Sequence, residues 1–313
     1  MKRFLANVLK FAIPFPLFFG AVVALFPATP QASKNLLFGE RRKDYLLANV
    51  GSPRIIFAGG SNLCFGLDSQ AVKDALRLNP INTGLHAGLG LRYMLENTER
   101  HIGKGDIVVV VLEYGALHKK YSNYWSKELA HMVFDVDLSK LKLLTARQIL
   151  GVLPFAPEIC FSKLNCRAYR DAPESGIYSA DSFNEYGDVD KHWGKAKRRF
   201  AAYNEMGTAL NKDAIAALRK FRANVEKKGA IIYFSYPGMQ SQSFENQKHE
   251  IKQIEEEYKK AGFATLGTPE RYAMDDSLMF DTPYHLNKDG VDRRTALLIE
   301  DLLETKPQLQ MFE

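Results

Sequence analysis

The sequence predicts an α/β fold with a mostly parallel sheet. Short apolar strands alternate with helical patterns along the folded part of the chain, as in βαβ units. The clearest strand, DIVVVVL at Asp106–Leu112, contains four consecutive valines, which suits a parallel strand covered on both faces. In such sheets ligands bind beyond the carboxyl ends of the strands, so functional residues are expected at that edge.

The first half of the folded chain supplies two strands and a long insertion. The apolar run Arg54–Ala58 predicts a buried strand, because two glycines follow it. A short helix is predicted at Gln70–Leu78, before the valine-rich strand. Residues 116–207 are rich in aromatic, Asn, Asp and Gly residues and predict an irregular insertion with some helix near 138–151.

The second half returns to regular alternation. Apolar residues at helical spacing predict a helix that Gly229 ends, and Asn287 is the expected N-cap of the last helix. The predicted elements are a helix at Asp213–Lys227, a strand at Ala230–Ser235, a charged helix at 244–260, a short strand at Phe263–Leu266 and a helix at Lys288–Leu303.

Composition and charge exclude several classes of protein. Of the 313 residues, 25% are charged and 46% are apolar, which excludes a disordered or low-complexity chain. A mean hydropathy of −0.23 excludes a protein with many membrane spans. The net charge of +6 is too small to predict a nucleic-acid partner. Three cysteines exclude a disulfide-built scaffold; Cys160 and Cys166 either close a small loop or remain separate thiols.

Residues 1–33 have the pattern of a targeting segment. An apolar stretch at Phe11–Phe26 follows a start with three basic residues and no acidic one, namely Lys2, Arg3 and Lys10. We expect an uncleaved signal anchor whose basic end stays in the cytoplasm. A cleaved signal peptide and a buried N-terminal helix of a cytosolic protein are the alternatives. Either targeting segment places the folded domain, 34–313, on the periplasmic side of the cytoplasmic membrane.

A serine follows the first predicted strand, in the sequence GGSN at 59–62. The two glycines permit a tight turn and leave the hydroxyl of Ser61 open at the carboxyl edge of the sheet. The motif is neither a P-loop nor a G-x-S-x-G elbow, because it lacks the lysine of the first and the last glycine of the second. By itself, Gly-Gly-Ser is equally typical of an ordinary turn.

A second candidate motif lies near the C-terminus, where FDTPYHLNKDG places Asp281 and His285 in one loop before the last predicted helix. A serine nucleophile needs a base within hydrogen-bond reach, and that imidazole needs a carboxylate to fix its tautomer. One short loop supplies both groups. The alternative is that His285 caps the helix and Asp281 is a turn residue.

The chain order Ser…Asp…His, with the serine after the first strand, resembles the SGNH, or GDSL-like, hydrolase superfamily. The resemblance rests on GGSN at 59–62 and DTPYHLNKDG at 281–290. It implies a three-layer α/β/α, flavodoxin-like fold. It also implies that Ser61 is the nucleophile, His285 the general base and Asp281 the residue that orients the imidazole.

The two motifs depart from the family pattern. Gly60 replaces the usual aspartate before the serine. Three residues, rather than two, separate the aspartate from the histidine in the last block. Asp275, Asp276 or a backbone carbonyl are therefore alternatives to Asp281 as the group that orients the imidazole.

The oxyanion hole is the third point of departure. In the family, the serine N–H, a glycine N–H and an asparagine side chain donate hydrogen bonds to the developing oxyanion. The resemblance assigns the first two to Ser61 and Gly88. The block after the valine-rich strand has Glu113 and Tyr114 but no asparagine, so Asn62 or a donor from the insertion is expected in its place. We expect Glu113 and Tyr114 to bind or orient the substrate.

The N-terminal anchor together with these motifs is similar to the SGNH-type proteins that accompany membrane-bound O-acyltransferases in cell-envelope polysaccharide modification. This implies an extracytoplasmic serine esterase or O-acyltransferase that acts on acyl esters, commonly acetyl esters, of a polysaccharide through an acyl-serine intermediate. It also implies a membrane-bound O-acyltransferase as a partner. No cofactor is expected, and the remaining histidines lack metal-ligand spacing, so no catalytic metal is expected.

The segment 178–193 of the insertion has the composition of a sugar-binding surface. Tyr and Trp rings offer apolar faces, and Asn, Asp and Glu side chains bind hydroxyl groups. The alternative is that these aromatic rings pack on the core of the domain itself. The candidate substrate-binding residues of the segment are Asn184, Tyr186, His192 and Trp193.

Two other hypotheses remain beside the enzyme. The first is a non-catalytic glycan-binding or assembly partner that keeps the fold, favoured by the missing asparagine and the wider Asp–His spacing. It predicts that Ser61→Ala leaves the function intact. The second is an α/β domain with coincidental motifs, which predicts that Ser61 and His285 lie far apart.

Overall fold

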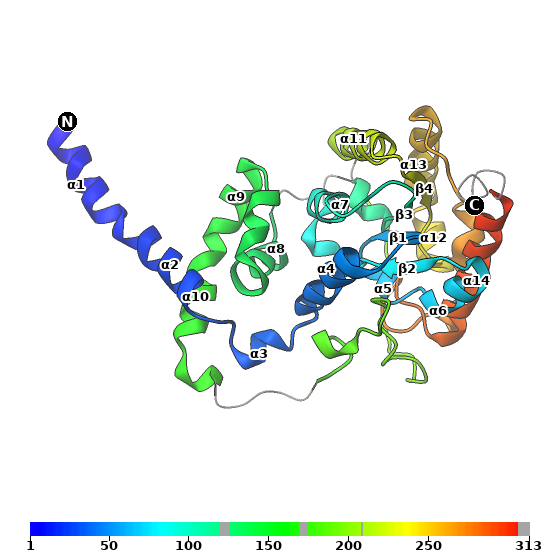
Figure 1. The fold of residues 1–313 in the computed structure, drawn as a ribbon, viewed down its shortest axis with the longest axis horizontal. Helices are drawn as coiled ribbons and strands as arrows, with labels where there is room; N and C mark the ends of the chain where they lie inside the picture. Colours follow the sequence, from blue (N-terminus) through cyan, green and yellow to red (C-terminus); the bar gives the residue numbers. More distant parts are fainter. Residues whose placement is uncertain (119–124, 170–174, 208, 306–313) are drawn as a thin grey trace.

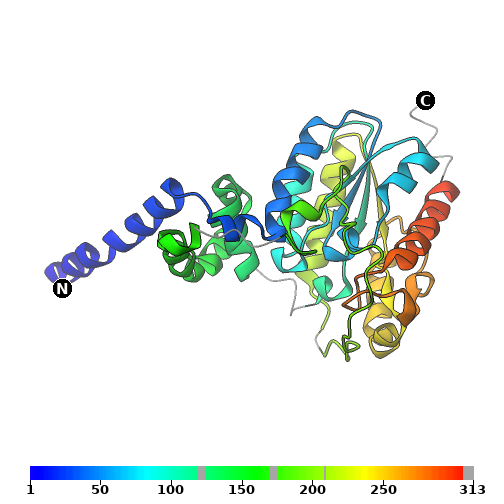
Figure 2. The same ribbon diagram turned by 90° about the horizontal axis from the view of Figure 1, so that it is seen from below.

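The protein is a four-stranded parallel sheet with helices on both faces, within the part of the chain that the structure describes (Figures 1 and 2). The structure is a computed structural model and describes residues 1–118, 125–169, 175–207 and 209–305. The strand order is β2-β1-β3-β4, and β5 pairs with β6 separately. The strands are β1 (Arg54–Gly59), β2 (Asn79–Asn82), β3 (Ile107–Val111), β4 (Ile231–Ser235), β5 (Met239–Gln240) and β6 (Ala273–Met274).

The α-helices fall into an N-terminal arm, an α/β domain and the insertion (Figure 1). The arm has α1 (Lys2–Ala12), α2 (Pro14–Leu25) and α3 (Pro30–Ser33). The insertion has α8 (Lys127–His131), α9 (Ala146–Val152) and α10 (Ala156–Leu164). The α/β domain has α4 (Glu40–Asn49), α5 (Ser61–Cys64), α6 (Ser69–Leu76), α7 (Leu91–Glu99), α11 (Lys212–Lys227), α12 (Ser241–Asn246), α13 (Lys248–Lys260) and α14 (Lys288–Glu304).

Two cores hold helices to opposite faces of the sheet. Successive side chains of a strand point to opposite faces. Ile56 and Val108 therefore join a core with α4, α7, α11 and α13, whereas Ile55 and Val109 join a second core with α6 and α14. Strands β1 and β3 are buried along their whole length, which explains why their sequences are continuous apolar runs rather than alternating ones.

The strand registers bring three carboxyl ends to one edge of the sheet. Gly59 at the end of β1 pairs with Val111 at the end of β3. Val111 in turn pairs with Ser235 at the end of β4. The chain segments that follow these strands therefore start side by side, as the parallel sheet predicted.

The predicted α/β fold with a mostly parallel sheet is confirmed, and several details differ. The last helix has its predicted N-cap, because Asn287 Oδ1 accepts a hydrogen bond from Gly290 N at 3.0 Å. The predicted helix at 244–260 is instead α12 and α13, separated at Gln247. The predicted strand at Phe263–Leu266 is a single bridge to β4. Strand β2 was not predicted, because its sequence NPIN lacks an apolar run.

The N-terminal arm and the helices α8–α10 of the insertion lie together on one side of the sheet (Figure 2), whereas residues 175–207 of the insertion run along the α/β domain. The targeting segment forms two helices, α1 and α2, rather than one. Among the helices that the structure describes, none combines the length and the apolar character needed to cross a membrane. The insertion was predicted to be irregular with some helix near 138–151. Helix α9 overlaps that stretch, whereas α8 and α10, on either side of it, were not predicted. Its cysteines Cys160 and Cys166 are both free.

Candidate active site

Ser61 lies at the start of α5, directly beyond the carboxyl end of β1. The glycines before it are required by close backbone packing. A Cβ at Gly59 would lie 2.0 Å from the carbonyl oxygen of Val111, and a Cβ at Gly60 would lie 3.2 Å from Glu113 Oε1. The Gly-Gly pair thus lets β1 pass close to β3 and brings Ser61 beside Glu113.

Glu113 is the direct partner of the serine hydroxyl. Ser61 Oγ donates a hydrogen bond to Glu113 Oε1 at 2.9 Å. The backbone N–H of Asn62 points to the same oxygen at 3.4 Å. The carboxylate therefore lies beside the serine and accepts hydrogen bonds from both Ser61 and Asn62.

Asp281 and His285 form a hydrogen-bonded dyad. His285 Nδ1 donates to Asp281 Oδ1 at 2.9 Å, and both side chains are buried. Burial alone would raise the pKa of Asp281, but hydrogen bonds from His285 and Tyr178 outweigh it and hold that pKa below its usual value. The ionised carboxylate keeps the ring hydrogen on Nδ1, which leaves Nε2 as the nitrogen that can accept a proton.

The alternative carboxylates have other partners. Asp275 Oδ1 accepts from Ser277 N at 2.8 Å, and Asp276 pairs with Lys197 and Gln240. Of the three candidate aspartates, Asp281 is therefore the one that the structure places on the imidazole.

A phenylalanine connects the dyad to the serine. Phe65 follows α5, and its N–H donates to the carbonyl of Ser61 at 3.0 Å. The imidazole of His285 stacks on the Phe65 ring, with centroids 4.2 Å apart and an interplanar angle of 13°. The backbone also connects the two segments, because Leu286 N donates to Phe65 O at 3.2 Å. The imidazole of His285 thus contacts the residue that lies four positions after Ser61, whereas the hydroxyl of Ser61 itself is bonded to Glu113.

Tyr178 of the insertion contacts both residues of the dyad through its hydroxyl group. Its hydroxyl donates to Asp281 Oδ2 at 2.7 Å and lies 3.0 Å from His285 Nδ1. Burial, together with the hydrogen bond to Asp281, raises the pKa of Tyr178 well above its usual value, so the phenol remains a donor. Both carboxylate oxygens of Asp281 are therefore bound, and its orientation toward the imidazole is fixed.

We expect Tyr178→Phe to lower kcat about tenfold, since one hydrogen bond to a charged group is worth about 1.5 kcal/mol. Because Tyr178 positions the dyad, KM should stay nearly constant while kcat falls. Steady-state kinetics on p-nitrophenyl acetate measure both. Tyr186→Phe is the matched control, because Tyr186 lies in the same segment but its hydroxyl donates to Gln70. Equal losses in the two variants would contradict the positioning role.

A cavity of about 670 Å³ lies beside Glu113, the hydrogen-bond partner of Ser61. Gly88 and Tyr284, which precedes His285, also line it, but Ser61, Asp281 and His285 are not among its lining residues. The insertion contributes Ser126, Glu128 and residues 203–206 to the lining. These residues of the insertion, rather than the segment 178–193 that was predicted to bind sugar, line the cavity.

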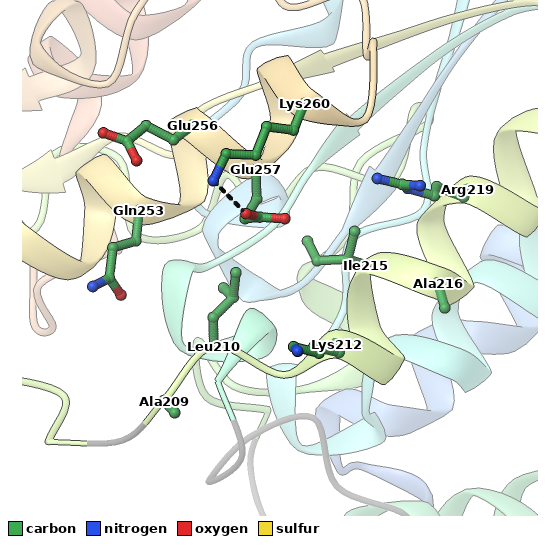
Figure 3. A pocket seen from close by; sticks show the side chains of 10 residues that line it. All are labelled: Ala209, Leu210, Lys212, Ile215, Ala216, Arg219, Gln253, Glu256, Glu257 and Lys260. Atoms are coloured by element: carbon green, nitrogen blue, oxygen red, sulfur yellow. Dashed lines mark hydrogen bonds and ion pairs between the residues drawn. The ribbon is translucent and has the colours of Figure 1, made fainter.

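A second cavity, of about 650 Å³, lies between α11 and α13 (Figure 3). Leu210 and Ile215 line it together with charged side chains, among which Lys260 and Glu257 form an ion pair at 2.9 Å. It contains none of the residues predicted from the sequence. The cavity beside Glu113 is therefore the candidate substrate site.

The structure corrects two of the predicted oxyanion donors. Gly88 N already donates to His86 Nδ1 at 3.0 Å. The side chain of Asn62 turns toward the sheet, where its Nδ2 donates to Val111 O at 3.3 Å. Neither group is aimed at the cavity, so the backbone N–H groups at the start of α5 are the remaining candidates. The N–H of Ser61 stays a prediction.

The predicted substrate-binding residues are only partly at the site. Glu113 lines the cavity, but Tyr114 and His192 lie in the interior, which corrects both assignments. His192 packs on Phe65, and its Nε2 donates to Leu286 O at 2.8 Å. Burial lowers the pKa of His192 to about 4, so the ring stays neutral.

Three further residues of the insertion are also absent from the cavity wall. Asn184 Oδ1 accepts from the N–H groups of Tyr186 and Asp188 and so fixes a turn of its own loop. The ammonium of Lys288 lies 4.4 Å above the Trp193 ring. Asn184, Tyr186 and Trp193 do not line the cavity, so their predicted contact with a glycan stays a prediction.

Tyr178, Phe65, Glu128 and the segment 203–206 belong to the site but were not singled out from the sequence. Their contacts are long-range, and no spacing rule relates them to Ser61 or His285. One signal was available for Tyr178, since it opens the aromatic segment that the sequence analysis connected with function.

Burial raises the pKa of Cys64 to about 12, so this thiol, three residues after Ser61, stays protonated. No three His, Cys, Asp or Glu side chains converge as a metal site in the part of the chain that the structure describes. The groups with suitable geometry for chemistry are Ser61, Glu113 and the Asp281–His285 dyad.

No protein-family model matches the sequence, and a search of curated proteins finds no match either. The function must therefore be argued from the site itself.

Proposed function

We propose that the protein is a serine esterase or O-acyltransferase of SGNH type, acting through an acyl-Ser61 intermediate. The observation that supports this most is the Asp281–His285 hydrogen bond of 2.9 Å, made on a ring that stacks against Phe65, one helical turn from Ser61. A serine, an imidazole and a carboxylate that orients the imidazole are the elements of acyl transfer.

The reaction follows from these roles. Ser61 Oγ releases Glu113 and attacks the ester carbonyl, while its proton passes to His285 Nε2. The tetrahedral intermediate collapses, the alcohol leaves with that proton, and the acyl group remains on Ser61. Water or a sugar hydroxyl then attacks the acyl-serine, with His285 as the base again. Asp281 stays ionised and stabilises the imidazolium in both steps.

The charge of the cavity favours a substrate that is neutral or cationic. Glu113, Glu128 and Glu205 line it, and its described lining includes no lysine or arginine. Carboxylates repel phosphate and uronate groups, whereas hydroxyl and amino groups donate hydrogen bonds to them. Acyl esters of neutral or amino sugars are therefore the proposed substrates, with a cell-envelope or extracellular polysaccharide as their source.

The proposed setting is the outer side of the cytoplasmic membrane, with the arm as the anchor and a membrane-bound O-acyltransferase as the partner. The basic, acid-free start of the chain supports this orientation.

A fluorophosphonate probe tests the nucleophile directly. We expect it to add to Ser61, as measured by intact mass and peptide mapping. The adduct should be lost in Ser61→Ala and in His285→Ala, each checked for folding by circular dichroism. Ser126→Ala is the matched control, because Ser126 lines the cavity beside Glu113 and donates to Gly88 O, and it should still be labelled. An adduct that persists in Ser61→Ala overturns the assignment.

A non-catalytic glycan-binding partner is the second candidate, and the Ser61–Glu113 hydrogen bond favours it. The hydroxyl of the serine is bonded to a carboxylate, and the N–H of Gly88 is already bonded to His86. The site therefore lacks a complete oxyanion hole. This candidate predicts that the probe leaves the folded wild type unlabelled and that Ser61→Ala binds glycan as wild type does.

A further inference from the structure

Exposed apolar side chains gather in two segments of the chain. Every exposed leucine, isoleucine and phenylalanine whose side chain the structure describes lies in 4–26 or in 138–161. In the second segment, Leu150 is 69% exposed and Phe161 is 63% exposed. Single exposed apolar residues are ordinary on a protein surface, but such a concentration marks an interaction surface.

The two segments are packed against each other. Helix α10 of the insertion lies along α2 of the arm (Figures 1 and 2). Phe161 and Phe19 make an edge-to-face contact with centroids 6.2 Å apart. Lys163 Nζ donates to the carbonyl of Phe26 at 3.3 Å. Any molecule or membrane that covers the arm at α2 is therefore expected to contact α10 of the insertion as well.

The charges around these segments favour an anionic partner. Residues 1–39 contain no aspartate or glutamate, and 138–169 contain only Glu158, which pairs with Lys127 at 2.6 Å. Exposed basic residues accompany the apolar ones, namely Arg3, Lys10, Lys142 and Arg167. Apolar side chains mixed with basic ones, with almost no acidic residue, are typical of helices that lie in the headgroup region of a bilayer with anionic lipids.

We propose that the helix pair α9–α10 of the insertion is a second membrane-contacting element, which lies in the lipid headgroup region beside the N-terminal arm. The occupant of this surface is a bilayer containing anionic lipid. The inference rests on exposure, packing and charge, and it does not depend on the proposed catalytic function. Ser126 and Glu128, at the start of α8, line the cavity beside Glu113. Because α8 contacts α9, the element would hold that cavity close to the membrane surface.

A fluorescent label on α10 tests the proposal in the full-length protein. Cys64 and Cys160 are buried, so Phe161→Cys with Cys166→Ser offers one exposed thiol. The labelled protein is reconstituted in phosphatidylethanolamine vesicles with phosphatidylglycerol, with plain or brominated acyl chains. The matched control is Lys252→Cys with Cys166→Ser, which places the label at an exposed position on α13, at the far end of the molecule from the arm (Figure 1).

We expect the label at 161 to emit at shorter wavelength on reconstitution and to lose emission in brominated lipid, while the label at 252 changes in neither way. A label at Leu150 on α9 repeats the measurement without touching the Phe161–Phe19 contact. The proposal is overturned if brominated lipid does not change the emission of the labels at 150 and 161 and aqueous iodide quenches them as strongly as the label at 252. That result would leave the surface to a protein partner.

Discussion

Asp281→Asn is expected to lower kcat on p-nitrophenyl acetate by about 10⁴-fold while leaving KM nearly unchanged. The amide fits the space of the carboxylate, but its NH₂ group faces His285 Nδ1, where Asp281 Oδ1 now accepts at 2.9 Å. The ring hydrogen then moves to Nε2, and this nitrogen can no longer take the proton of Ser61. The loss arises from the wrong tautomer rather than from a lost contact.

Asp276→Asn is the control for this prediction. Asp276 lies five residues earlier, is exposed, and bonds Lys197 and Gln240 instead of the imidazole. It was also one of the alternatives that the sequence left open for the orienting carboxylate. We expect its kcat to stay within a few-fold of wild type. A large loss in Asp276→Asn with little loss in Asp281→Asn would reverse the assignment.

The free energy of unfolding, measured at several pH values, distinguishes the effect of the charge of Asp281 from the effect of its shape. Its folded pKa is lower than the usual 3.8, so the ionised group stabilises the fold. That contribution is complete above about pH 4 and disappears as the pH falls through the folded pKa. Urea titrations should therefore show Asp281→Asn less stable than wild type at neutral pH, with the difference shrinking in acid. A difference that is independent of pH would contradict this.

The sheet could be predicted because its signals are local. The valine run of β3 and the glycines after β1 identify buried parallel strands without knowledge of any neighbour. Strand β2 could not be predicted, since its NPIN sequence pairs with β1 only through the tertiary context. In the insertion, the helix predicted near 138–151 overlaps α9, whereas α8 and α10 were not predicted. Helix α10 packs on α2 of the arm, and exposed apolar residues such as Phe161 obscure its amphipathic pattern.

The contact between Asp281 and His285 was predictable from the sequence, whereas the surroundings of Ser61 were not. Ser61, Asp281 and His285 follow from two short motifs whose position relative to the sheet is fixed by chain order. The partner of Ser61 did not follow, although Glu113 had been noted at the end of β3. The sequence places a carboxylate at the end of a strand, but only the structure shows that it accepts a hydrogen bond from Ser61 Oγ at 2.9 Å.

Glu113→Gln is expected to raise kcat/KM for ester cleavage about 10²-fold. The Glu113 carboxylate lies 2.9 Å from Ser61 Oγ and 3.4 Å from Asn62 N, close to where negative charge develops on the substrate oxygen. Two unit charges 4 Å apart repel by about 4 kcal/mol near a protein surface, which opposes the tetrahedral intermediate. Glutamine removes this charge and offers an N–H donor. Loss of one such donor from an oxyanion hole lowers kcat about 10²- to 10³-fold.

Glu128→Gln controls for the general loss of one negative charge from the cavity. Glu128 lines the same cavity, and its carboxylate lies against Gly88 rather than against the serine. We expect its kcat/KM to change only a few-fold. A fall in activity confined to Glu113→Gln would instead make Glu113 the group that receives the serine proton, and His285 would then act on the leaving group alone. If wild type and Glu113→Gln are both folded and inert toward ester and fluorophosphonate, the non-catalytic glycan-binding function is the one that fits Ser61 held by Glu113.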